Sequence, residues 1–484
     1  MKKITLYILT VLLFSSCENM LDEVPKDFVS RANFYTNETD AQGALNGAYA
    51  ATGPDFYGIT YYLMVELHGD YLNGRGSQAP ISIMDQVLNQ QNIGRVSSNW
   101  LTLYRAINRA NAVLNNVPNI EDITEEARSR ILGEAYFLRA MAYFELVRGW
   151  GRVPIKTNES TDLTELEAPR MPESDVYDLI ISDLTIAEND LPEDVGAETG
   201  KASKWAAKMM LSHVYLTLGD WAQAATKAND VIASGKYSMV EVTEPNDFYR
   251  IFAAETSSED IMSIHHSETS TSTIPTYLHR GSAYPYNNNS QGFFAWLPDM
   301  NSWIGDSWDT NDLRKQFNFY TEYQDADGNW VSLPSTVPVL MKKFINNADG
   351  LSIYSVPIYR YTEAFLFYAE AACQAEGSPS TLALERLNMV KRRAYGYDPA
   401  VASPVDYPAG MSKEEFIETV LQERAYEFMV ERRRWFDLKR TGKVKEAFAA
   451  VGKNILDERF LWPIPEDELN NNPAINQADQ NPGY

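Results

Sequence analysis

Apolar residues recur every three or four positions over long stretches of the chain, which is the spacing of an amphipathic helix. The pattern predicts helices at 40–49, 100–117, 124–148 and 173–191. Pro118 follows the second of these stretches, and Gly149 and Gly151 follow the third. Glycine and proline directly after a periodic stretch are typical of helix ends, so both helices are expected to stop there.

Two later stretches each predict a pair of helices joined by a short turn, at 202–234 (turn at 219–220) and 363–394 (turn at 376–379). In both, small and large residues fall on positions that are favoured in tetratricopeptide repeats. Such pairs need neighbours to bury their faces. We therefore expect the helices at 100–148 and 413–440 to pack beside them.

The helical pattern is interrupted in two parts of the chain. Residues 50–99 predict loops, and 236–358 combine turns rich in Pro, Asn and Ser with short β-like runs at 260–265 and 330–333. The aromatic content of the second part argues against disorder. The predicted fold is therefore mainly α, a tetratricopeptide-like scaffold of helical pairs with a large irregular, loop-rich insertion that carries short strands.

The first residues predict export. Lys2 and Lys3 precede an apolar run at 4–14, Ser15-Ser16 are small, and Cys17 follows at once, as in the lipobox of bacterial lipoproteins. An ordinary signal peptide that contains a Cys is the alternative. The predicted segments are a signal at 1–16, a lipid anchor and tether at 17–40, the first part of the scaffold at 41–235, the insertion at 236–358, and the second part of the scaffold with the C-terminal segment at 359–484.

Charge and cysteine content narrow the possible partners. The net charge of −24 repels phosphate backbones, so nucleic acid is not expected as a partner. The chain has two cysteines, Cys17 and Cys373. With Cys17 carrying lipid and Cys373 buried in an apolar helix, no disulfide is expected, and stability must come from packing.

Several motifs lie on the predicted helices and near the end of the chain. They are the run Glu134 to Ala140 with Tyr143-Phe144, Trp150-Gly151 with Val153-Pro154, Gly219-Asp220-Trp221, Glu423-Arg424 with the run Glu431 to Arg440, and Trp462 to Pro465. Through them the chain resembles the SusD/RagB family of outer-membrane nutrient-binding lipoproteins of Bacteroidetes. One departure is Arg432, where the family usually has Gly.

The aromatic and charged residues of these helices are expected to hold the scaffold together. We expect this of Trp100, Trp150 and Trp435. An ion-pair lattice between helices is expected for the group Glu427, Glu431, Arg434 and Asp437.

Two aromatic and polar patches fit sugar binding. A sugar ring has an apolar face and a hydroxyl rim, which suit flat aromatic surfaces and planar polar groups. Residues 277–308 contain eight aromatic residues, and a second patch lies at 70–75; in the resembled family, loops at about these places contribute to the ligand surface. The candidate ligand-binding residues are Asp70, Tyr71, Asn73, Arg75, Tyr284, Tyr286, Trp296, Asn301, Trp303 and Trp308. Alternatively, the aromatics only hold a long loop in place.

No catalytic residue, metal site or cofactor is predicted. The motifs of zinc proteases, serine hydrolases and P-loop proteins are absent, and the few His residues lack a full ligand set. The stretch 325–329 faintly resembles a calcium loop, but its Gly comes too early and a β-turn is expected. Because carboxylates are plentiful, paired acids for glycoside hydrolysis stay possible.

The resemblance implies a non-catalytic, lipid-anchored protein that faces the cell surface at the outer membrane. There it binds an oligo- or polysaccharide and works with a SusC-like TonB-dependent transporter in nutrient uptake. Two alternatives stay open: a surface glycoside hydrolase, which would release reducing sugar, and a repeat-type adaptor for peptides or proteins, which would not bind glycans.

Overall fold

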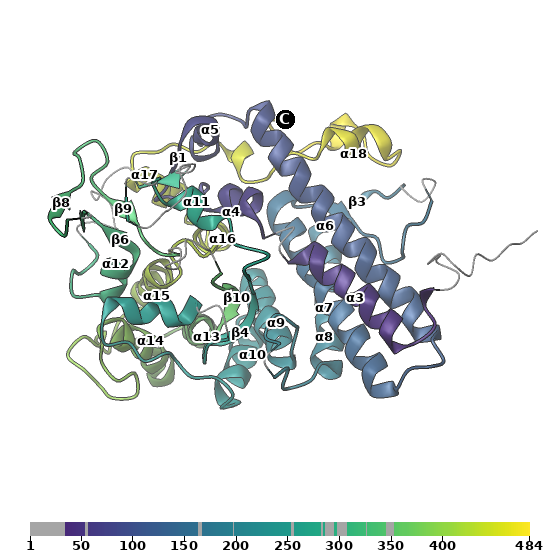
Figure 1. The fold of residues 1–484 in the computed structure, drawn as a ribbon, viewed down its shortest axis with the longest axis horizontal. Helices are drawn as coiled ribbons and strands as arrows, with labels where there is room; N and C mark the ends of the chain where they lie inside the picture. The colour runs from purple at the N-terminus through teal and green to yellow at the C-terminus, as the bar shows by residue number, and fades with distance from the viewer. Residues whose placement is uncertain are drawn as a thin grey trace, which may run out of the picture.

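Long helices form one array in the computed structural model, and short strands accompany them (Figure 1). The structure describes residues 34–53, 57–162, 167–196, 198–252, 256–281, 284–285, 295–297, 307–325, 327–344 and 353–484. The longer helices are α3 (Glu38–Thr52), α4 (Ile59–Glu66), α6 (Gln90–Asn116), α7 (Glu125–Trp150), α8 (Glu173–Asp190), α9 (Lys204–Leu218), α10 (Trp221–Ala233), α13 (Tyr361–Glu376), α14 (Thr381–Ala394) and α15 (Lys413–Glu427). The shorter helices are α5 (Ala79–Ser82), α11 (Ile274–Leu278), α12 (Leu313–Asn318), α16 (Arg434–Arg440), α17 (Val444–Ala450) and α18 (Glu466–Asn471), together with 3₁₀ turns such as η1 (Gly76–Gln78) and η4 (Pro245–Phe252).

Helices of the array pack against one another largely in chain order. α3 lies against α6 and α7, α8 contacts both α7 and α9, and α9 pairs with α10. α10 then packs against α13, which contacts α14 and α15. The mainly α fold and the helical pairs predicted at 202–234 and 363–394 are confirmed, and the two pairs stack directly although the loop-rich segment separates them in the sequence.

The region predicted as loops at 50–99 is more helical than expected. It contains α4 and α5, and α6 begins at Gln90, ten residues before the predicted start. The side chain of Asn89 caps this helix by accepting a hydrogen bond from the backbone N–H of Asn92 at 3.0 Å. The first turns of α6 carry mostly polar residues, so the apolar periodicity did not indicate where this helix begins.

The motif Glu423 to Arg440, which was expected to lie on one helix, belongs to two helices. α15 ends at Glu427 and α16 begins at Arg434. Between them Val430 and Arg432 have φ angles of 54° and 62°. This left-handed backbone conformation breaks an α-helix, and the prediction of a continuous helix was wrong.

The strands of the described residues form two-stranded antiparallel sheets. The pairs are β1 (Asn73–Gly74) with β5 (Ala295–Trp296), β2 (Val153–Pro154) with β3 (Arg170–Met171), β4 (Asp260–Ile264) with β10 (Val356–Arg360), β6 (Phe319–Tyr320) with β9 (Leu340–Met341), and β7 (Glu322–Gln324) with β8 (Trp330–Ser332). The β-like runs predicted at 260–265 and 330–333 are thus confirmed. β4 and β10 are buried, and because β10 leads directly into α13, their pairing ties the loop-rich segment to the helical array.

The turn between β7 and β8 is held by Asp325, whose carboxylate accepts hydrogen bonds from the backbone N–H groups of Asp327 and Asn329. The β-turn expected at 325–329 is confirmed. The segment boundaries given by the sequence stay a prediction.

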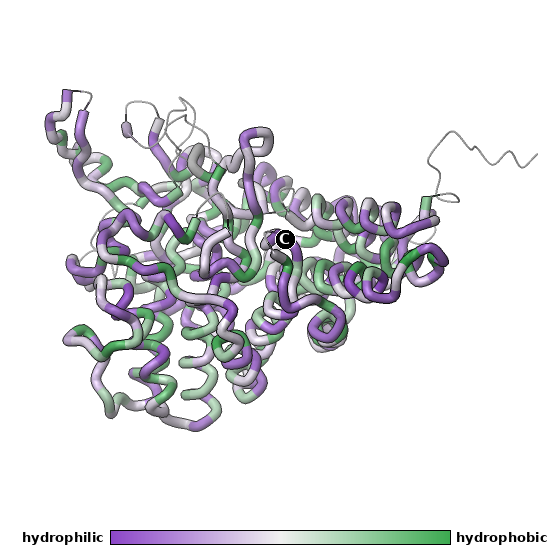
Figure 2. The backbone as a smooth tube through the Cα atoms, turned by 60° about the horizontal axis from the view of Figure 1, so that its bottom comes forward, coloured by the Kyte–Doolittle hydropathy of each residue, from purple (hydrophilic) through white to green (hydrophobic). Residues whose placement is uncertain are grey.

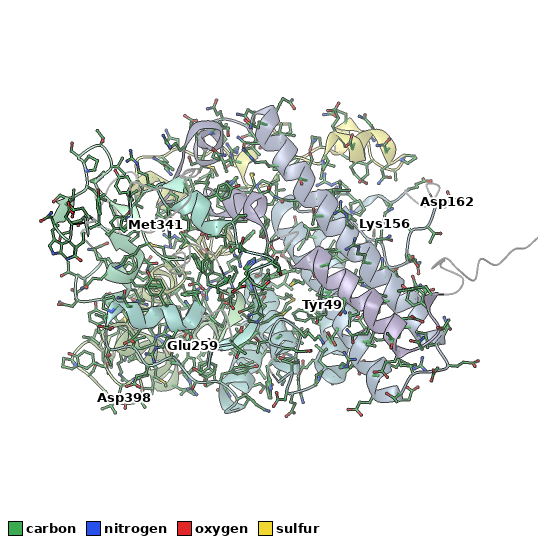
Figure 3. All side chains as sticks on the ribbon, viewed as in Figure 1. Tyr49, Lys156, Asp162, Glu259, Met341 and Asp398 are labelled. Carbon is green, nitrogen blue, oxygen red and sulfur yellow. The ribbon has the colours of Figure 1, made fainter. Side chains whose placement is uncertain are left out.

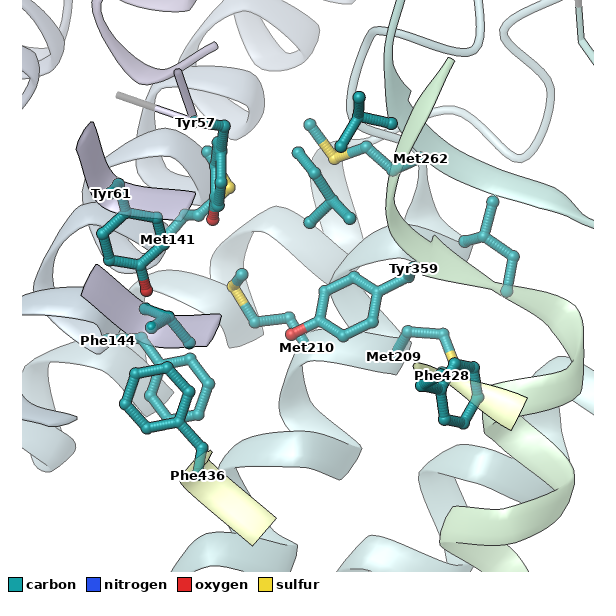
Figure 4. Close-up of a cluster of buried hydrophobic side chains, with 14 of the residues drawn as sticks. Tyr57, Tyr61, Met141, Phe144, Met209, Met210, Met262, Tyr359, Phe428 and Phe436 are labelled. Atoms are coloured by element: carbon teal, nitrogen blue, oxygen red, sulfur yellow. The ribbon is translucent and has the colours of Figure 1, made fainter. Parts of the chain in front are cut away.

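One apolar core joins the two parts of the helical scaffold. In its centre, shown in Figure 4, Tyr61 of α4 and Phe144 of α7 lie near Phe436 of α16. Apolar and polar residues alternate along the long helices, as the green and purple segments of Figure 2 show. Trp100, Trp150, Trp435 and the free thiol of Cys373 are all buried. No helix among the described residues is both long and apolar enough to cross a bilayer.

The ion-pair lattice predicted from the motif helices is confirmed, and it lies in the interior. Its pairs are Glu427 with Arg314, Arg360 and Arg393, Glu431 with Lys343 and Arg360, Asp437 with Arg424 and Arg440, and Arg434 with Asp70. Glu259, labelled near the middle of the molecule in Figure 3, also pairs with Arg393. The lattice joins α12, β10 and α14 to α15 and α16. Each buried charge in it has a partner, so none is left uncompensated.

Candidate functional site

The two patches singled out in the sequence meet in the structure. β1 comes from the patch at 70–75 and β5 from the patch at 277–308, and they pair antiparallel with Asn73 opposite Trp296 and Gly74 opposite Ala295. Figure 1 shows β1 beside α5 and α11 at the upper edge of the molecule. The pairing creates one surface from segments that lie more than 200 residues apart in the sequence.

The turn after β1 requires glycine. A Cβ on Gly74 would lie 2.1 Å from the carbonyl oxygen of Gln78, a distance at which the backbone would have to move. Gly76 has a φ of +58°, which favours glycine over residues with a side chain. The hydroxyl of Ser82 accepts a hydrogen bond from the backbone N–H of Gly74 at 2.8 Å and fixes the turn on α5.

Side chains below β1 anchor it to the helical scaffold. The carboxylate of Asp70 accepts two hydrogen bonds from Arg434. The hydroxyl of Tyr71 donates to Glu66 and accepts from the backbone N–H of Val430. Asp70 and Tyr71 are only 1 % and 3 % exposed. Their polar atoms point into the interior and hold the loop. The expectation that Asp70 and Tyr71 contact ligand is therefore corrected.

Lys453 makes a further link by donating to the carbonyl of Leu72 at 3.0 Å. Burial lowers the pKa of Lys453 to about 8, although Asp70 partly opposes this shift. The lysine therefore remains largely protonated at neutral pH and ties α17 and its following turn to β1.

The outward side of β1 carries Asn73, which is half-buried, and Arg75, which is exposed. Beside them, Arg95 of α6 donates to the carbonyl and hydroxyl of Ser77 at 3.5 and 3.3 Å. Burial raises the pKa of Tyr277 in α11, while the positive charge of Arg95 lowers it. The surface thus combines an amide, two guanidinium groups and a phenol.

Arg95 is a member of this surface that sequence reasoning missed. The helix was predicted to start at residue 100, so Arg95 was assigned to a loop with no defined direction. The Asn89 cap, which lies directly before an amphipathic stretch, was the signal that could have placed it on α6.

The remaining candidates separate into three groups. Tyr284 lies in a small second cluster, with its ring centroid 5.4 Å from that of Tyr323. Trp308 is 1 % exposed and stacks on Tyr426 at 4.3 Å, so its expected place on the ligand surface is corrected. Tyr286, Asn301, Trp303 and the side chain of Trp296 lie outside the described residues.

An exposed aromatic residue lies on the hairpin that carries Tyr323. Trp330, at the end of the β7–β8 hairpin, is 66 % exposed, although large apolar side chains are usually covered. Among the described residues, no group of three or more His, Cys, Asp or Glu is arranged to hold a metal ion. The aromatic rings of Tyr284, Tyr323 and Trp330 and the polar groups at β1 suit stacking on a ligand and hydrogen bonding to it.

The structure is a helical-repeat fold with a polar surface at the β1–β5 pair. Two family models match separate parts of the chain: one described as starch-binding and associating with the outer membrane, over residues 36–216, and that of the SusD family, over residues 283–484. The chain belongs to the SusD/RagB family, whose members bind carbohydrate and associate with the outer membrane.

Individual relatives agree with this assignment. SusD-like protein P2 of Formosa agariphila is 27 % identical over 517 residues, which cover 100 % of this chain and 99 % of that protein. A SusD homologue from Bacteroides thetaiotaomicron has a similar fold, with a TM-score of 0.80 at 22 % identity over 93 % of this chain and 98 % of that one. A laminarin-binding SusD-like protein is similar at a TM-score of 0.74 and 23 % identity over 93 % of this chain and 100 % of that one.

Proposed function

We propose that this protein is a non-catalytic glycan-binding lipoprotein of the outer membrane that presents oligo- or polysaccharide to a TonB-dependent transporter. The β1–β5 surface is its binding site. Asn73 and Arg75 provide hydrogen-bonding groups for sugar hydroxyls, and Trp296 and Tyr277 provide aromatic faces. Neighbouring members of the family include a laminarin-binding protein and a surface glycan-binding protein of Bacteroides fluxus, which support this ligand class.

The pairing of Asn73 with Trp296 carries the proposal. It joins the two patches that suit sugar binding on chemical grounds, and the buried anchors Asp70 and Tyr71 hold it in a fixed shape. A preformed surface costs less conformational entropy on binding than a loop that must first become ordered.

Affinity electrophoresis tests this site. The protein lacking residues 1–17 is run in gels that contain different soluble polysaccharides. We expect retardation by at least one of them, and a loss of retardation in Arg75→Ala and Trp296→Ala. Arg105→Ala removes an exposed arginine from α6 and is the matched control that should run like the wild type. Wild-type retardation in both site variants would contradict the β1–β5 site, and release of reducing sugar would contradict a non-catalytic role.

The membrane part of the proposal has two elements: a lipid anchor at Cys17 and an orientation toward the cell surface. Cys17→Ala should move the protein from the outer-membrane fraction to the soluble fraction. Detergent extracts of the native membrane should yield the wild-type protein together with a TonB-dependent transporter. Isolation of the protein without any transporter would overturn the proposed partnership.

A further inference from the structure

An open cavity, which shares no lining residue with the β1–β5 surface, lies beside α15. Its volume is about 560 Å³, and it is lined by the segment 307–312, by α15 and by the end of α14 with the connection that follows it. Tyr395, Tyr407, Tyr426 and Trp308 form its aromatic walls. A cavity of this size holds a monosaccharide-sized molecule.

The cavity has an excess of negative charge. Five carboxylates line it against one lysine, Lys391. Asp312 and Glu423 pair with the buried Arg314, and Glu418 pairs with Lys443. Asp309 and Glu415 form no ion pair with any described residue. An added cation would therefore be attracted to these two carboxylates.

Asp309 is held in its charged form. Its carboxylate accepts a hydrogen bond from the backbone N–H of Asn311 at 2.9 Å and another from the hydroxyl of Tyr395 at 3.2 Å. The hydrogen bond from Asn311 is the main reason that the pKa of Asp309 lies below its ordinary value. A protonated amine in the cavity would meet a negative charge at any pH near neutral.

One ammonium group already occupies part of the cavity. The Nζ atom of Lys391 lies 3.5 Å from the centre of the Tyr407 ring, which is the geometry of a cation–π contact.

We infer that this cavity binds a hexosamine with a free amine, which is a sugar that carries a positive charge. The ammonium group of the sugar pairs with Asp309 and Glu415. Its ring lies against the tyrosine side chains. Neither a neutral sugar nor a simple amine satisfies both features.

Calorimetric titration tests the inference with the protein lacking residues 1–17. Glucosamine, glucose, N-acetylglucosamine and putrescine are titrated separately at slightly acidic pH. Glucosamine should bind more tightly than the other three. Equal binding of glucose or N-acetylglucosamine would overturn the requirement for a charge, equal binding of putrescine would overturn the requirement for a sugar, and the absence of glucosamine binding would overturn the site.

Two variants with opposite effects keep the test independent of folding defects. Asp309→Asn should weaken glucosamine binding about tenfold, because it removes one charge-assisted hydrogen bond. Lys391→Met should tighten it, because the competing ammonium leaves the Tyr407 ring. If glucosamine bound elsewhere on the protein, both variants would bind it with the affinity of the wild type. This outcome would overturn the assignment of the site to the cavity beside α15.

Asp398→Asn is the matched control. Like Asp309, Asp398 is exposed, and its carboxylate accepts a hydrogen bond at 2.9 Å from the backbone N–H of the residue two positions later, Ala400. Unlike Asp309, it does not line the cavity. It lies at the lower edge of the view in Figure 3. Asp398→Asn should bind glucosamine like the wild type, and so should Arg75→Ala, which separates this site from the β1–β5 surface.

Discussion

The carboxylate of Asp70 and the guanidinium group of Arg434 form two parallel hydrogen bonds, of 2.9 and 2.7 Å, across 364 residues of sequence. The side chain of Asp70 is fully buried and that of Arg434 is 14 % exposed. Two parallel bonds fix direction as well as distance. The pair thereby attaches the loop that carries Asn73 and Arg75 to the first turn of α16.

Asp70→Ala should destabilise the protein by about 3–5 kcal/mol, because it leaves the charge of Arg434 without its partner in a mostly buried place. Denaturant unfolding followed by circular dichroism measures this free energy. Combined with Arg434→Ala, the loss should be clearly smaller than the sum of the two single effects. Additive losses would show that the two side chains do not interact.

Gly74→Ala should abolish retardation by polysaccharide and lower the free energy of unfolding by about 1–3 kcal/mol, because the new methyl group overlaps the backbone at Gln78. Gly94→Ala is the matched control. A Cβ there meets nothing within 4 Å, and alanine in a helix should add about 0.5–1 kcal/mol of stability. Retention of binding by Gly74→Ala would mean that the turn is not needed for the site.

Arg432 adopts a left-handed backbone conformation in spite of its side chain. Its guanidinium group lies 5.1 Å from the centre of the Tyr57 ring and donates to the carbonyl of Pro357 at 3.0 Å. Arg432→Ala and Arg432→Gly both lose these contacts, but only glycine relieves the backbone. Arg432→Gly should therefore be about 1 kcal/mol more stable than Arg432→Ala in thermal or denaturant unfolding. Equal stabilities would indicate that the backbone at this position is not strained.

The ion pairs of Glu427 make stability depend on pH. Burial alone would raise the pKa of Glu427, but the guanidinium groups of Arg393, Arg360 and Arg314 outweigh burial and hold the pKa well below its ordinary value. The unfolded carboxylate titrates near about pH 4.3. The stability that this group contributes is therefore fully present above that pH and is lost as the pH falls toward the lower folded value.

Glu427→Gln should lower the free energy of unfolding at neutral pH by about 3–5 kcal/mol, because three buried guanidinium groups lose a negative partner. Its stability should also change less than that of the wild type when the pH falls from about 5 to about 3. Urea unfolding at several pH values measures both effects. Glu121→Gln replaces an exposed glutamate and should follow the wild type; an equally steep pH dependence in Glu427→Gln would assign the acid sensitivity to other carboxylates.

The helical pairs could be predicted from local pattern because each has its own period and its own stop signal. Gly219 and Gly377 end α9 and α13 in the left-handed conformation that glycine favours, and no distant contact is needed to foresee this. The lattice around Glu427 could be anticipated as well, since buried charges must be paired. Its partners Arg314 and Lys343 could not, because both come from the loop-rich segment.

The break between α15 and α16 shows why other features could not be predicted. The hydroxyl of Tyr62 donates to the carbonyl of Val430, and the backbone N–H of Arg432 donates to Glu66. These distant groups stabilise a backbone conformation that the local sequence opposes. No pattern within 413–440 contains that information.

By itself, the sequence determined the class of fold, the positions of most helices and the residue types from which a sugar surface can be built, because these depend on periodicity and on the chemistry of single side chains. Only the tertiary structure decided which of those residues face outward. It turned Asp70, Tyr71 and Trp308 into the interior and set Asn73 opposite Trp296. The physical reason is that a polar or aromatic residue gains as much from a buried partner as from a ligand, and only long-range packing decides which of the two it meets.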